Sequence, residues 1–521
     1  EISEAIDFTR YAAHLTLGHE QQIADGLTWT PYRVIVVAGP WNFPYAIPAS
    51  GLVHAIAAGC AVIMKPAPET RAVAAALVDH LRTAGVPDGL VQLACTPDDE
   101  VGRHLITHDD VDKVMLTGSY DTAAMFLEWK PTLRINAETS GKNSLIITAA
   151  ADIDQAIKDI VRSAFGHAGQ KCSAASLGIV EASVYDDRSF HRRLADAVTS
   201  LKVGLPLDPA TKVGPLIGPP GASLRRALTT LEPGESWLVK PGPLDDRERL
   251  WSPGVRTGVA PGSWFHLTEC FGPVLGIMRA DSLDHAIELQ NAPEYGLTGG
   301  VHSLDPKEID RWLDRVQVGN AYVNRHITGA IVQRQPFGGW KRSSIGAGQK
   351  PGGPSHLHGY GTWTQDDPDP ARAGDSFAAA WAAHFSRDND PTALACEGNV
   401  LRYRPFEAVI VIVPVDDIIA RALASRAATT CGVSLIIVPE ETQALRIASG
   451  MGPHFTRVRA PSGASADLRR RLQGLGIDVD DAPLTASGTV ELPHWLLEQS
   501  ISRTRHRYGR LSDRRPAVSG V

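Results

Sequence analysis

The chain has 521 residues, of which 43% are hydrophobic and 21% charged, and its formal net charge is -7. A chain of this length exceeds what one hydrophobic core supports, so we expect two or three domains. The negative charge argues against a nucleic-acid-binding protein, which would carry a basic face. No apolar run reaches the roughly 18 residues that a membrane-spanning helix needs, so we expect no transmembrane segment.

The cysteines are scattered and form no Cys-x-x-Cys pair. They are Cys60, Cys95, Cys172, Cys270, Cys396 and Cys431. This distribution predicts neither a zinc site nor a disulfide framework and fits a reducing compartment, so we expect no metal and a cytoplasmic location. The first residue is Glu1, inside an apparent helix (SEAIDFTRYAAHL), and we expect the chain to be a piece of a longer protein.

The first part of the chain alternates strands and helices. Residues 32–38 (YRVIVVA) and 60–66 (CAVIMKP) read as strands buried on both faces, and small or amphipathic helices are expected at 49–58 and 72–84. The first strand runs into GPWNFP, a turn that Pro40 and Pro44 stiffen. This rhythm predicts a parallel, doubly wound sheet with ligands at the carboxyl ends of its strands. Asn42 and Lys65 stand at such ends.

Two short motifs follow. A strand at 113–116 leads into Thr117, Gly118 and Ser119 at a helix start, where backbone N–H groups suit a phosphate or ribose oxygen, although this motif alone is weak and no GxGxxG is present. AETSGKN then places Glu138 in a glycine-bearing turn before a strand at 144–148. We expect an amphipathic helix at 152–165, capped by Asp152, immediately before the next motif.

The motif FGHAGQKCSAAS, residues 165–176, sets Cys172 between glycines and small residues. Gly166 and Gly169 would let the backbone approach a ligand closely, and Ser173 to Ser176 would leave room for a substrate. A thiol attacks well as a thiolate in a polar, partly open setting, so a nucleophilic cysteine is one interpretation. A small buried structural cysteine is the other.

The later part of the chain contains TECFGPV at 268–274 and a glycine-rich stretch from 319 to 354 that reads as loops lining a site. An acidic, proline-bearing linker is expected at 365–375. Beyond it, strands at 409–414 and 432–439 echo the first block, because RPFEAVIVIVPVDD is similar to TPYRVIVVAGPWNF. We interpret this as a degenerate internal repeat without the Asn and Lys, although any two αβ units share some likeness.

GPWNFP, AETSGKN, GQKCSAAS, TECFGP and QPFGG occur in the order and spacing of the aldehyde dehydrogenase superfamily, which residues 1–363 therefore resemble. GHAGQKCSAAS, HITGA and GGP resemble the L-glutamate γ-semialdehyde (Δ1-pyrroline-5-carboxylate) dehydrogenases. The tail from Trp495, WLLEQSISRTRHRYGRL, resembles the C-terminal end of proline utilization A enzymes, which fuse a flavin-dependent proline dehydrogenase upstream. FAD would therefore be implied only for such an upstream domain.

The resemblance implies an α/β aldehyde dehydrogenase fold, with a Rossmann-like NAD domain and an α/β catalytic domain, followed by a second, non-catalytic dehydrogenase-like domain. The expected boundaries are 1–137 for an N-terminally truncated NAD-binding domain, 138–320 for the catalytic domain, 321–364 for a return segment lining the aldehyde site, 365–375 for the linker and 376–521 for the C-terminal domain.

The resemblance also implies the chemistry. Cys172 would add to the aldehyde carbon, with the Asn42 amide and the Cys172 N–H as oxyanion donors. Glu138 would be the general base that activates Cys172, the hydrolytic water or both. Read alone, Asn42 could instead cap a turn and Glu138 could be a surface glutamate.

The expected cofactor is NAD. The resemblance assigns ribose hydroxyls to Lys65 and Glu269, and the nicotinamide end to Phe271. It assigns the adenosine and phosphate region to Pro40, Trp41, the Thr117–Gly118–Ser119 turn and the KPAPET stretch. Glu69 in that stretch would repel a 2′-phosphate, which favours NAD over NADP.

The substrate's α-amino acid end would be anchored by Ser173, Gly329 and Ala330, and its aliphatic chain would be flanked by Phe165 and Phe337. Both phenylalanines could equally be plain core. His326 precedes ITGA where the subfamily usually has Asn, which could alter this anchor or introduce a pH dependence.

The leading hypothesis is therefore NAD-dependent oxidation of L-glutamate γ-semialdehyde to L-glutamate, the second step of proline degradation, through a cysteine hemithioacetal and thioester. The alternatives are a dehydrogenase for another aldehyde and a non-catalytic scaffold of a larger proline-catabolic protein. We expect a homo-oligomer, possible fusion to an upstream proline dehydrogenase as part of a multifunctional enzyme, and no nucleic-acid partner.

Overall fold

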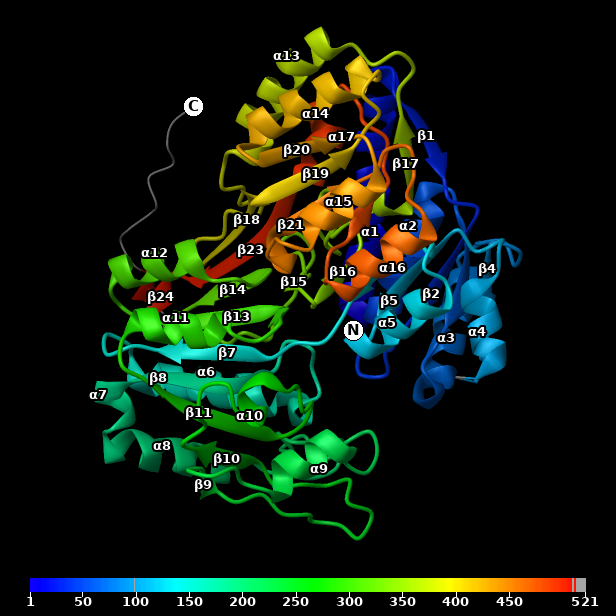
Figure 1. Ribbon diagram of the computed structural model, residues 1–521. Coiled ribbons are helices and arrows are strands. Elements are labelled where there is room, and N and C mark those ends of the chain that lie inside the picture. The colour runs from blue at the N-terminus through cyan, green and yellow to red at the C-terminus, as the bar shows by residue number, and fades with distance from the viewer. Residues whose placement is uncertain (98, 508–509, 512–521) are drawn as a thin grey trace. The chain divides into compact units, whose positions relative to one another are not determined.

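The computed structural model describes residues 1–97, 99–507 and 510–511 (Figure 1). No helix among them is long and apolar enough to cross a membrane. The chain divides into two compact units. Unit 1 comprises residues 1–140, 331–388 and 402–498, and unit 2 comprises 141–330, 389–401 and the described residues from 499 onward. The predicted C-terminal domain and the predicted tail include residues 508–509 and 512–521, which lie outside the described residues.

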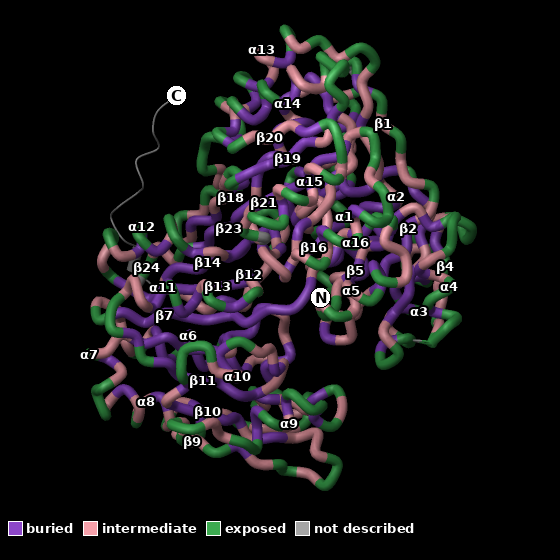
Figure 2. The backbone as a smooth tube through the Cα atoms, viewed as in Figure 1, coloured by how far each residue is buried: buried purple, intermediate pink, exposed green. Residues whose placement is uncertain are grey.

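Unit 1 contains a six-stranded sheet. Its order is β16 (Ser344–Ile345), β6 (Ile135–Glu138), β5 (Lys113–Thr117), β2 (Val34–Ala38), β3 (Ala61–Lys65) and β4 (Val91–Leu93), and all neighbours are parallel except the β16–β6 pair. The strands alternate in sequence with α2 (Ala46–Ala58), α3 (Arg71–Thr83), α4 (Glu100–Thr107) and α5 (Tyr120–Trp129). This is the predicted doubly wound sheet, and its β-branched central strands are buried (Figure 2).

The register of this sheet brings several predicted site residues to one edge. Thr117 pairs with Glu138, Leu116 pairs with Ala38, and Ala38 pairs with Lys65. Because neighbouring parallel strands end at the same edge, Lys65, Thr117 and Glu138 lie in a row at the carboxyl edge, where the residue 39–44 turn also begins.

The structure places Glu138 in a strand rather than in the predicted turn. It is the last residue of β6, and it pairs with Thr117 on one side and with Ser344 of β16 on the other. Because Glu138 pairs with strands on both sides, its backbone is extended. The nearby Gly141 suggested a turn, and the turn begins only after Glu138.

The later segment that resembles the first block in sequence forms a second, four-stranded sheet in unit 1. Its order is β20 (Ser434–Val438), β19 (Ala408–Ile412), β21 (Thr456–Arg459) and β22 (Val479–Asp480), and all pairs are parallel. The helices of this module are α14 (Ile418–Cys431), α15 (Glu441–Ala448) and α16 (Ala466–Gly474). β19 lies between β20 and β21, and β2 likewise lies between two parallel strands, β3 and β5, so this arrangement is compatible with the internal repeat (Figure 1).

The predicted linker is partly helical. Residues 370–375 form the first half of α13 (Pro370–Ala380), which packs on α14 and α17 (Gly488–Glu491). Asp369 accepts a hydrogen bond from the N–H of Ala371 at 2.8 Å, and Pro370 occupies the first helical position. The same Asp-Pro pair that suggested a linker is therefore a helix start.

Unit 2 contains most of a nine-stranded sheet ordered β18-β23-β14-β13-β7-β8-β11-β10-β9. Its bounds are β18 (Glu397–Pro405), β23 (Leu496–Thr504), β14 (Asn320–Val323), β13 (Thr298–His302), β7 (Asn143–Ile147), β8 (Ala175–Glu181), β11 (Val274–Ala280), β10 (Gly254–Thr257) and β9 (Ser236–Val239). Its principal helices are α6 (Ile153–Phe165), α8 (Arg188–Thr199), α9 (Ala222–Thr229), α11 (Leu283–Asn291) and α12 (Pro306–Arg315). Asp152 caps α6 as predicted, accepting from the N–H of Gln155 at 3.2 Å.

Candidate active site

The Cys172 motif connects α6 to β8 through a tight turn. His167 and Ala168 adopt positive φ values of 59° and 54°, and Gly169 follows with a φ of 69°. A Cβ at Gly169 would lie 2.3 Å from the carbonyl oxygen of Gly272, so this position requires glycine. A Cβ at Gly166 would meet no protein atom within 4 Å, so only Gly169 is confined by its neighbours, and the approach of a ligand to this turn stays a prediction. The turn leaves Cys172 partly exposed, as a nucleophile requires.

Asn143, the first residue of β7, fixes the backbone of this motif. Its side-chain Nδ2 donates to the carbonyl oxygens of Cys172, at 2.6 Å, and Ala174, at 3.0 Å, while its Oδ1 accepts from the N–H of Thr298 at 3.0 Å. Asn143 is only 3% exposed. A Cβ at Gly141 would lie 2.9 Å from the Cys172 oxygen, so the AETSGKN and Cys172 motifs pack directly together.

Glu138 is set in a constrained, largely desolvated position in unit 1. The N–H of Gly339 donates to its Oε2 at 3.0 Å, and a Cβ at Gly338 would lie 2.9 Å from its Oε1. Desolvation raises the pKa of Glu138 to about 8, while the Gly339 N–H and the Lys350 ammonium oppose that rise. A carboxyl whose pKa lies near the working pH suits a general base.

Lys350 and Glu498 extend this charged cluster. The Lys350 N–H donates to Glu498 Oε2 at 3.2 Å, and both side chains are buried. Burial lowers the pKa of Lys350 to about 8 and raises the pKa of Glu498, with each opposing the shift of the other. Trp340 Nε1 also donates to the Glu498 carbonyl at 2.9 Å. Glu498, on β23, thus holds the segment that supports Glu138.

The predicted oxyanion donor Asn42 and the predicted cofactor residues of unit 1 lie at or near the carboxyl edge of its first sheet. Asn42 and Lys65 are buried, Pro40, Trp41 and Thr117 are half-buried, and Gly118 and Ser119 are exposed. Ser119 caps α5, accepting from the N–H of Thr122 at 3.1 Å. Glu69 is exposed in the short helix after β3, so its carboxylate is accessible to a ribose. These residues fit a nucleotide at this edge, and their roles stay predictions.

In unit 2, Glu269 and Phe271 are held by local geometry. The N–H of Gly141 donates to Glu269 Oε1 at 2.9 Å, and Phe271 has a positive φ of 57°. Lys142 lies nearby, with Nζ 2.5 Å from Ser176 Oγ and 4.1 Å from the centre of the Phe265 ring. Burial lowers the pKa of Lys142 to about 8, and the Glu269 carboxylate opposes that shift.

The predicted substrate residues are distributed over both units. Ser173, Gly329 and Ala330 belong to unit 2, and the Gly329 carbonyl accepts from the Tyr322 hydroxyl at 2.5 Å. Phe165 is 1% exposed in the core of unit 2, and Phe337 is half-buried in unit 1. The structure thus assembles Cys172 and Ser173 in one loop and Lys65, Thr117 and Glu138 along one edge. The meeting of Asn42 and Glu138 with Cys172 stays a prediction.

His326 does not titrate near neutral pH. Burial lowers its pKa to about 4, and its Nδ1 lies 3.3 Å from the Thr328 hydroxyl. The imidazole is therefore neutral at physiological pH, and it contacts the predicted anchor loop through a hydrogen bond rather than a charge.

Three supporting residues escaped the sequence interpretation: Asn143, Lys350 and Glu498. Asn143 is the last residue of the AETSGKN motif, but nothing in the motif indicates that its side chain binds the backbone of the Cys172 loop. Lys350 and Glu498 are joined across 148 residues of sequence, and no local pattern signals that pairing.

A profile of the aldehyde dehydrogenase family matches residues 1–365. The chain belongs to the aldehyde dehydrogenase family. Among curated relatives, 1-pyrroline-5-carboxylate dehydrogenase of Geobacillus sp. (strain WCH70) is 36% identical over 376 residues, which cover 68% of this chain and 72% of that protein. The matched residues include the six-stranded sheet and seven strands of the nine-stranded one, and the expected fold class is confirmed.

Two solved structures extend this comparison. Proline utilization A (PutA) from Corynebacterium freiburgense is 46% identical, with a TM-score of 0.90, over 98% of this chain and 54% of that one. The 1-pyrroline-5-carboxylate dehydrogenase from Thermus with bound NAD is 33% identical, with a TM-score of 0.64, over 70% of this chain and 73% of that one. This chain thus spans about half the length of the PutA chain, and the match includes the module beyond residue 365.

Proposed function

We propose that this aldehyde dehydrogenase oxidises L-glutamate γ-semialdehyde, which is in equilibrium with Δ1-pyrroline-5-carboxylate, to L-glutamate, with NAD as the hydride acceptor. The observation that carries the proposal is the Cys172 loop, in which a partly exposed thiol is held by Asn143 next to the predicted anchor residue Ser173. The names of the relatives support the substrate, and the NAD-bound relative from Thermus supports the cofactor.

The thiol acts first. Cys172 Sγ, as the thiolate, adds to the aldehyde carbon, and the Asn42 amide and the Cys172 N–H stabilise the resulting oxyanion. Removing one such donor typically lowers the rate about a hundredfold to a thousandfold. NAD, when bound, would supply the hydride acceptor, and Lys65 and Glu269 are the residues that would hold its ribose hydroxyls. Cys172 keeps the oxidised substrate as a thioester.

Glu138 acts in the second half. Its carboxylate removes a proton from water, which attacks the thioester carbon and releases L-glutamate and the Cys172 thiolate. A pKa of about 8 makes this carboxylate a stronger base than an exposed glutamate. Ser173, Gly329 and Ala330 bind the substrate's α-carboxylate end, and Phe165 and Phe337 contact its aliphatic chain.

The wider setting is part of the same proposal. The match to PutA supports fusion to an upstream proline dehydrogenase, with FAD confined to that domain, and a place in the second step of proline degradation. We also propose that the protein is a homo-oligomer in the cytoplasm. We propose further that the C-terminal module has no catalytic residues of its own, because Val415 or Asp416 stands near the position that Asn42 occupies in the first repeat.

The test is a comparison of kcat/KM for pyrroline-5-carboxylate and for propanal with the purified chain, followed by NADH formation and L-glutamate release. The proposal predicts equal amounts of NADH and L-glutamate, preference for pyrroline-5-carboxylate, and preference for NAD over NADP. Turnover of propanal without turnover of pyrroline-5-carboxylate would refute the substrate and leave the reaction class standing.

A further inference from the structure

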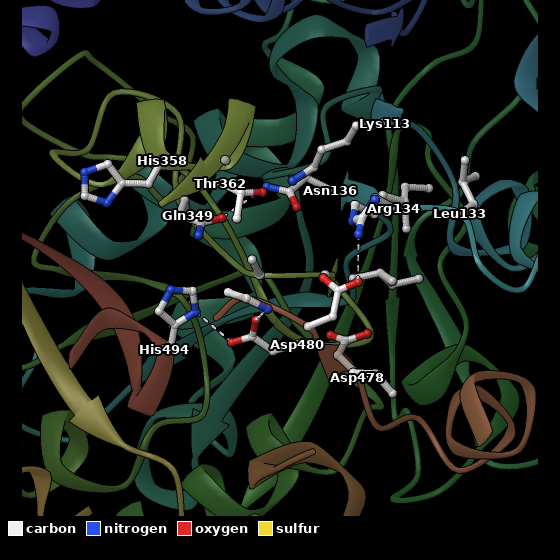
Figure 3. Close-up of a pocket in the computed structure, with 18 of the residues that line it drawn as sticks. Lys113, Leu133, Arg134, Asn136, Gln349, His358, Thr362, Asp478, Asp480 and His494 are labelled. Carbon is white, nitrogen blue, oxygen red and sulfur yellow. Dashed lines mark hydrogen bonds and ion pairs between the residues drawn. The ribbon is translucent and has the colours of Figure 1, made fainter. Parts of the chain in front are cut away.

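A cavity of about 270 Å³ lies within unit 1 (Figure 3). Lys113 and Ile135, the first residues of β5 and β6, line it, so it lies at the amino edge of the first sheet, whereas the predicted site residues stand at the carboxyl edge. Its walls come from β5 and β6, from the return segment at residues 345–363, and from the C-terminal module at residues 469–494. A single water needs only about 10–15 Å³ of such space, so this cavity has room for a small organic molecule.

Most charged residues on the cavity wall have ion-pair partners within unit 1. Asp481 accepts from Arg134 at 3.2 Å and from Arg469 at 2.9 Å, and His494 Nδ1 lies 2.7 Å from Asp480. Two charged residues differ from these. Among the described residues, neither Lys113 nor Asp478 forms an ion pair.

Lys113 is a buried cation directed into the cavity (Figure 3). Lys113 is 6% exposed, and its ammonium group makes no hydrogen bond or ion pair within the described part of the chain. The centre of the Tyr32 ring lies 5.4 Å from its Nζ. Burial lowers the pKa of Lys113 to about 8, so it still carries a charge at neutral pH. A buried ammonium has three donors, and leaving them unmatched is costly.

Asp478 is the complementary group. Figure 3 shows it on the side of the cavity opposite Lys113. It accepts a hydrogen bond from the Gly346 N–H, and burial raises its pKa to about 6 despite the Arg457 cation nearby. Arg457 is committed elsewhere, donating to the carbonyls of His494, at 3.2 Å, and Ala347, at 3.4 Å. Asp478 is therefore ionised at neutral pH without an ion-pair partner.

Lys113 and Asp478 are thus one cation and one anion on the cavity wall, each without an ion-pair partner among the described residues. A molecule carrying one charge of each sign would satisfy both. We propose that this cavity binds a small zwitterion of the amino-acid class, with its carboxylate on Lys113 and its ammonium group on Asp478. This site is separate from the proposed reaction and does not rest on it.

The experiment titrates the full 521-residue chain, without NAD or aldehyde, with ω-amino acids of increasing length: glycine, β-alanine, 4-aminobutanoate, 5-aminopentanoate and 6-aminohexanoate. Calorimetry should show that one chain length binds best, at one site per chain, because the two charged groups have a fixed separation. Butanoate and butylamine, which each carry a single charge, should bind at least about tenfold more weakly than the matching zwitterion.

Two variants locate the site. Lys113→Met and Asp478→Asn should each lower the affinity at least about tenfold, the size expected when a hydrogen-bonded charge partner is removed. Lys130→Met is the matched control, since Lys130 pairs with Asp109 at 3.7 Å and does not line the cavity. It should bind as the parent chain does.

Three results would overturn the proposal. No binding by any probe would mean that the cavity holds water only, and equal binding of the single-charge probes would mean that the two charged groups do not act together. Undiminished binding in both variants would place the ligand at the aldehyde site instead. If a variant fails to fold, the comparison of zwitterions with single-charge probes on the parent chain still decides.

Discussion

The N–H of Lys350 donates to Glu498 Oε2 at 3.2 Å, which ties the return segment of the dehydrogenase to a strand that follows the second αβ module. The same segment presents the Gly339 N–H to Glu138. The segment that contacts the proposed base is therefore held by a residue of β23, and we predict that this part of the chain influences the reaction through Glu138.

Replacing Lys350 with Met should raise the pKa of Glu138, because the Lys350 cation opposes the rise that desolvation causes. Less of the carboxylate would then be ionised near neutral pH, and kcat at pH 7 should fall roughly tenfold, the size of a one-unit displacement. A pH–rate profile measures this, and Lys350→Arg should restore much of it. A Met variant whose profile coincides with that of the parent would contradict the coupling.

The pH dependence of thioester hydrolysis should follow Glu138. Since its pKa is raised to about 8, the active carboxylate is the minor form at pH 7 and becomes the major form above pH 8. When hydrolysis limits turnover, kcat should therefore rise with pH through this range. Glu138→Gln should lose that rise, and a parent profile that is flat from about pH 7 to 9 would speak against Glu138 as the base.

Asn143→Ala should loosen the nucleophile loop. It leaves the Cys172 and Ala174 carbonyls and the Thr298 N–H without their buried partner, and each unmatched group costs about 1–3 kcal/mol. We expect a lower free energy of unfolding and slower alkylation of Cys172 by iodoacetamide. Denaturant unfolding and a thiol-reaction rate measure the two effects. Thr298→Ser serves as the control, since it keeps both the backbone N–H and the hydroxyl that donates to the Ser173 carbonyl. Unchanged alkylation would contradict the positioning role.

A cluster of buried histidines should make the protein acid-sensitive. Burial lowers the pKa of His19 and His54 to about 4, and that of His358 to about 3. The unfolded chain binds protons at these histidines below about pH 6.5 and the folded chain does not, so stability should fall as the pH drops from 6.5 toward 4.

The contribution of His54 to this pH dependence can be measured separately. Each such histidine contributes up to about 1.4 kcal/mol per pH unit. His54→Phe should therefore flatten the dependence of the unfolding free energy on pH, as measured by urea denaturation between about pH 5 and 7. His14→Phe, at an exposed position, should leave the slope unchanged. Equal slopes in His54→Phe and the parent would count against this origin.

Much of the fold was predictable because parallel strands buried on both faces read as continuous apolar runs. β2, β3 and β19 were found in this way, and the residues at their carboxyl ends followed from the rule that such edges meet. The Asp152 cap was equally visible, since capping depends on residues three positions apart.

The remaining features depend on contacts between distant segments. Glu138 looked like a turn residue because its pairing with Ser344 crosses more than two hundred positions. Asp369 and Pro370 looked like a linker because the same residues begin a helix that must pack on α14 to be stable. The cluster of Glu138, Lys350 and Glu498 has no local signal at all.

The central claim is that Cys172 captures the aldehyde and that Glu138 releases the acid. Single-turnover measurement of NADH tests it most directly, with pyrroline-5-carboxylate and saturating NAD. We predict that Glu138→Gln forms about one NADH per chain in a burst and then turns over at least about a hundredfold more slowly than the parent, while Cys172→Ala forms none. A burst in Cys172→Ala, or unimpaired turnover in Glu138→Gln, would contradict the account.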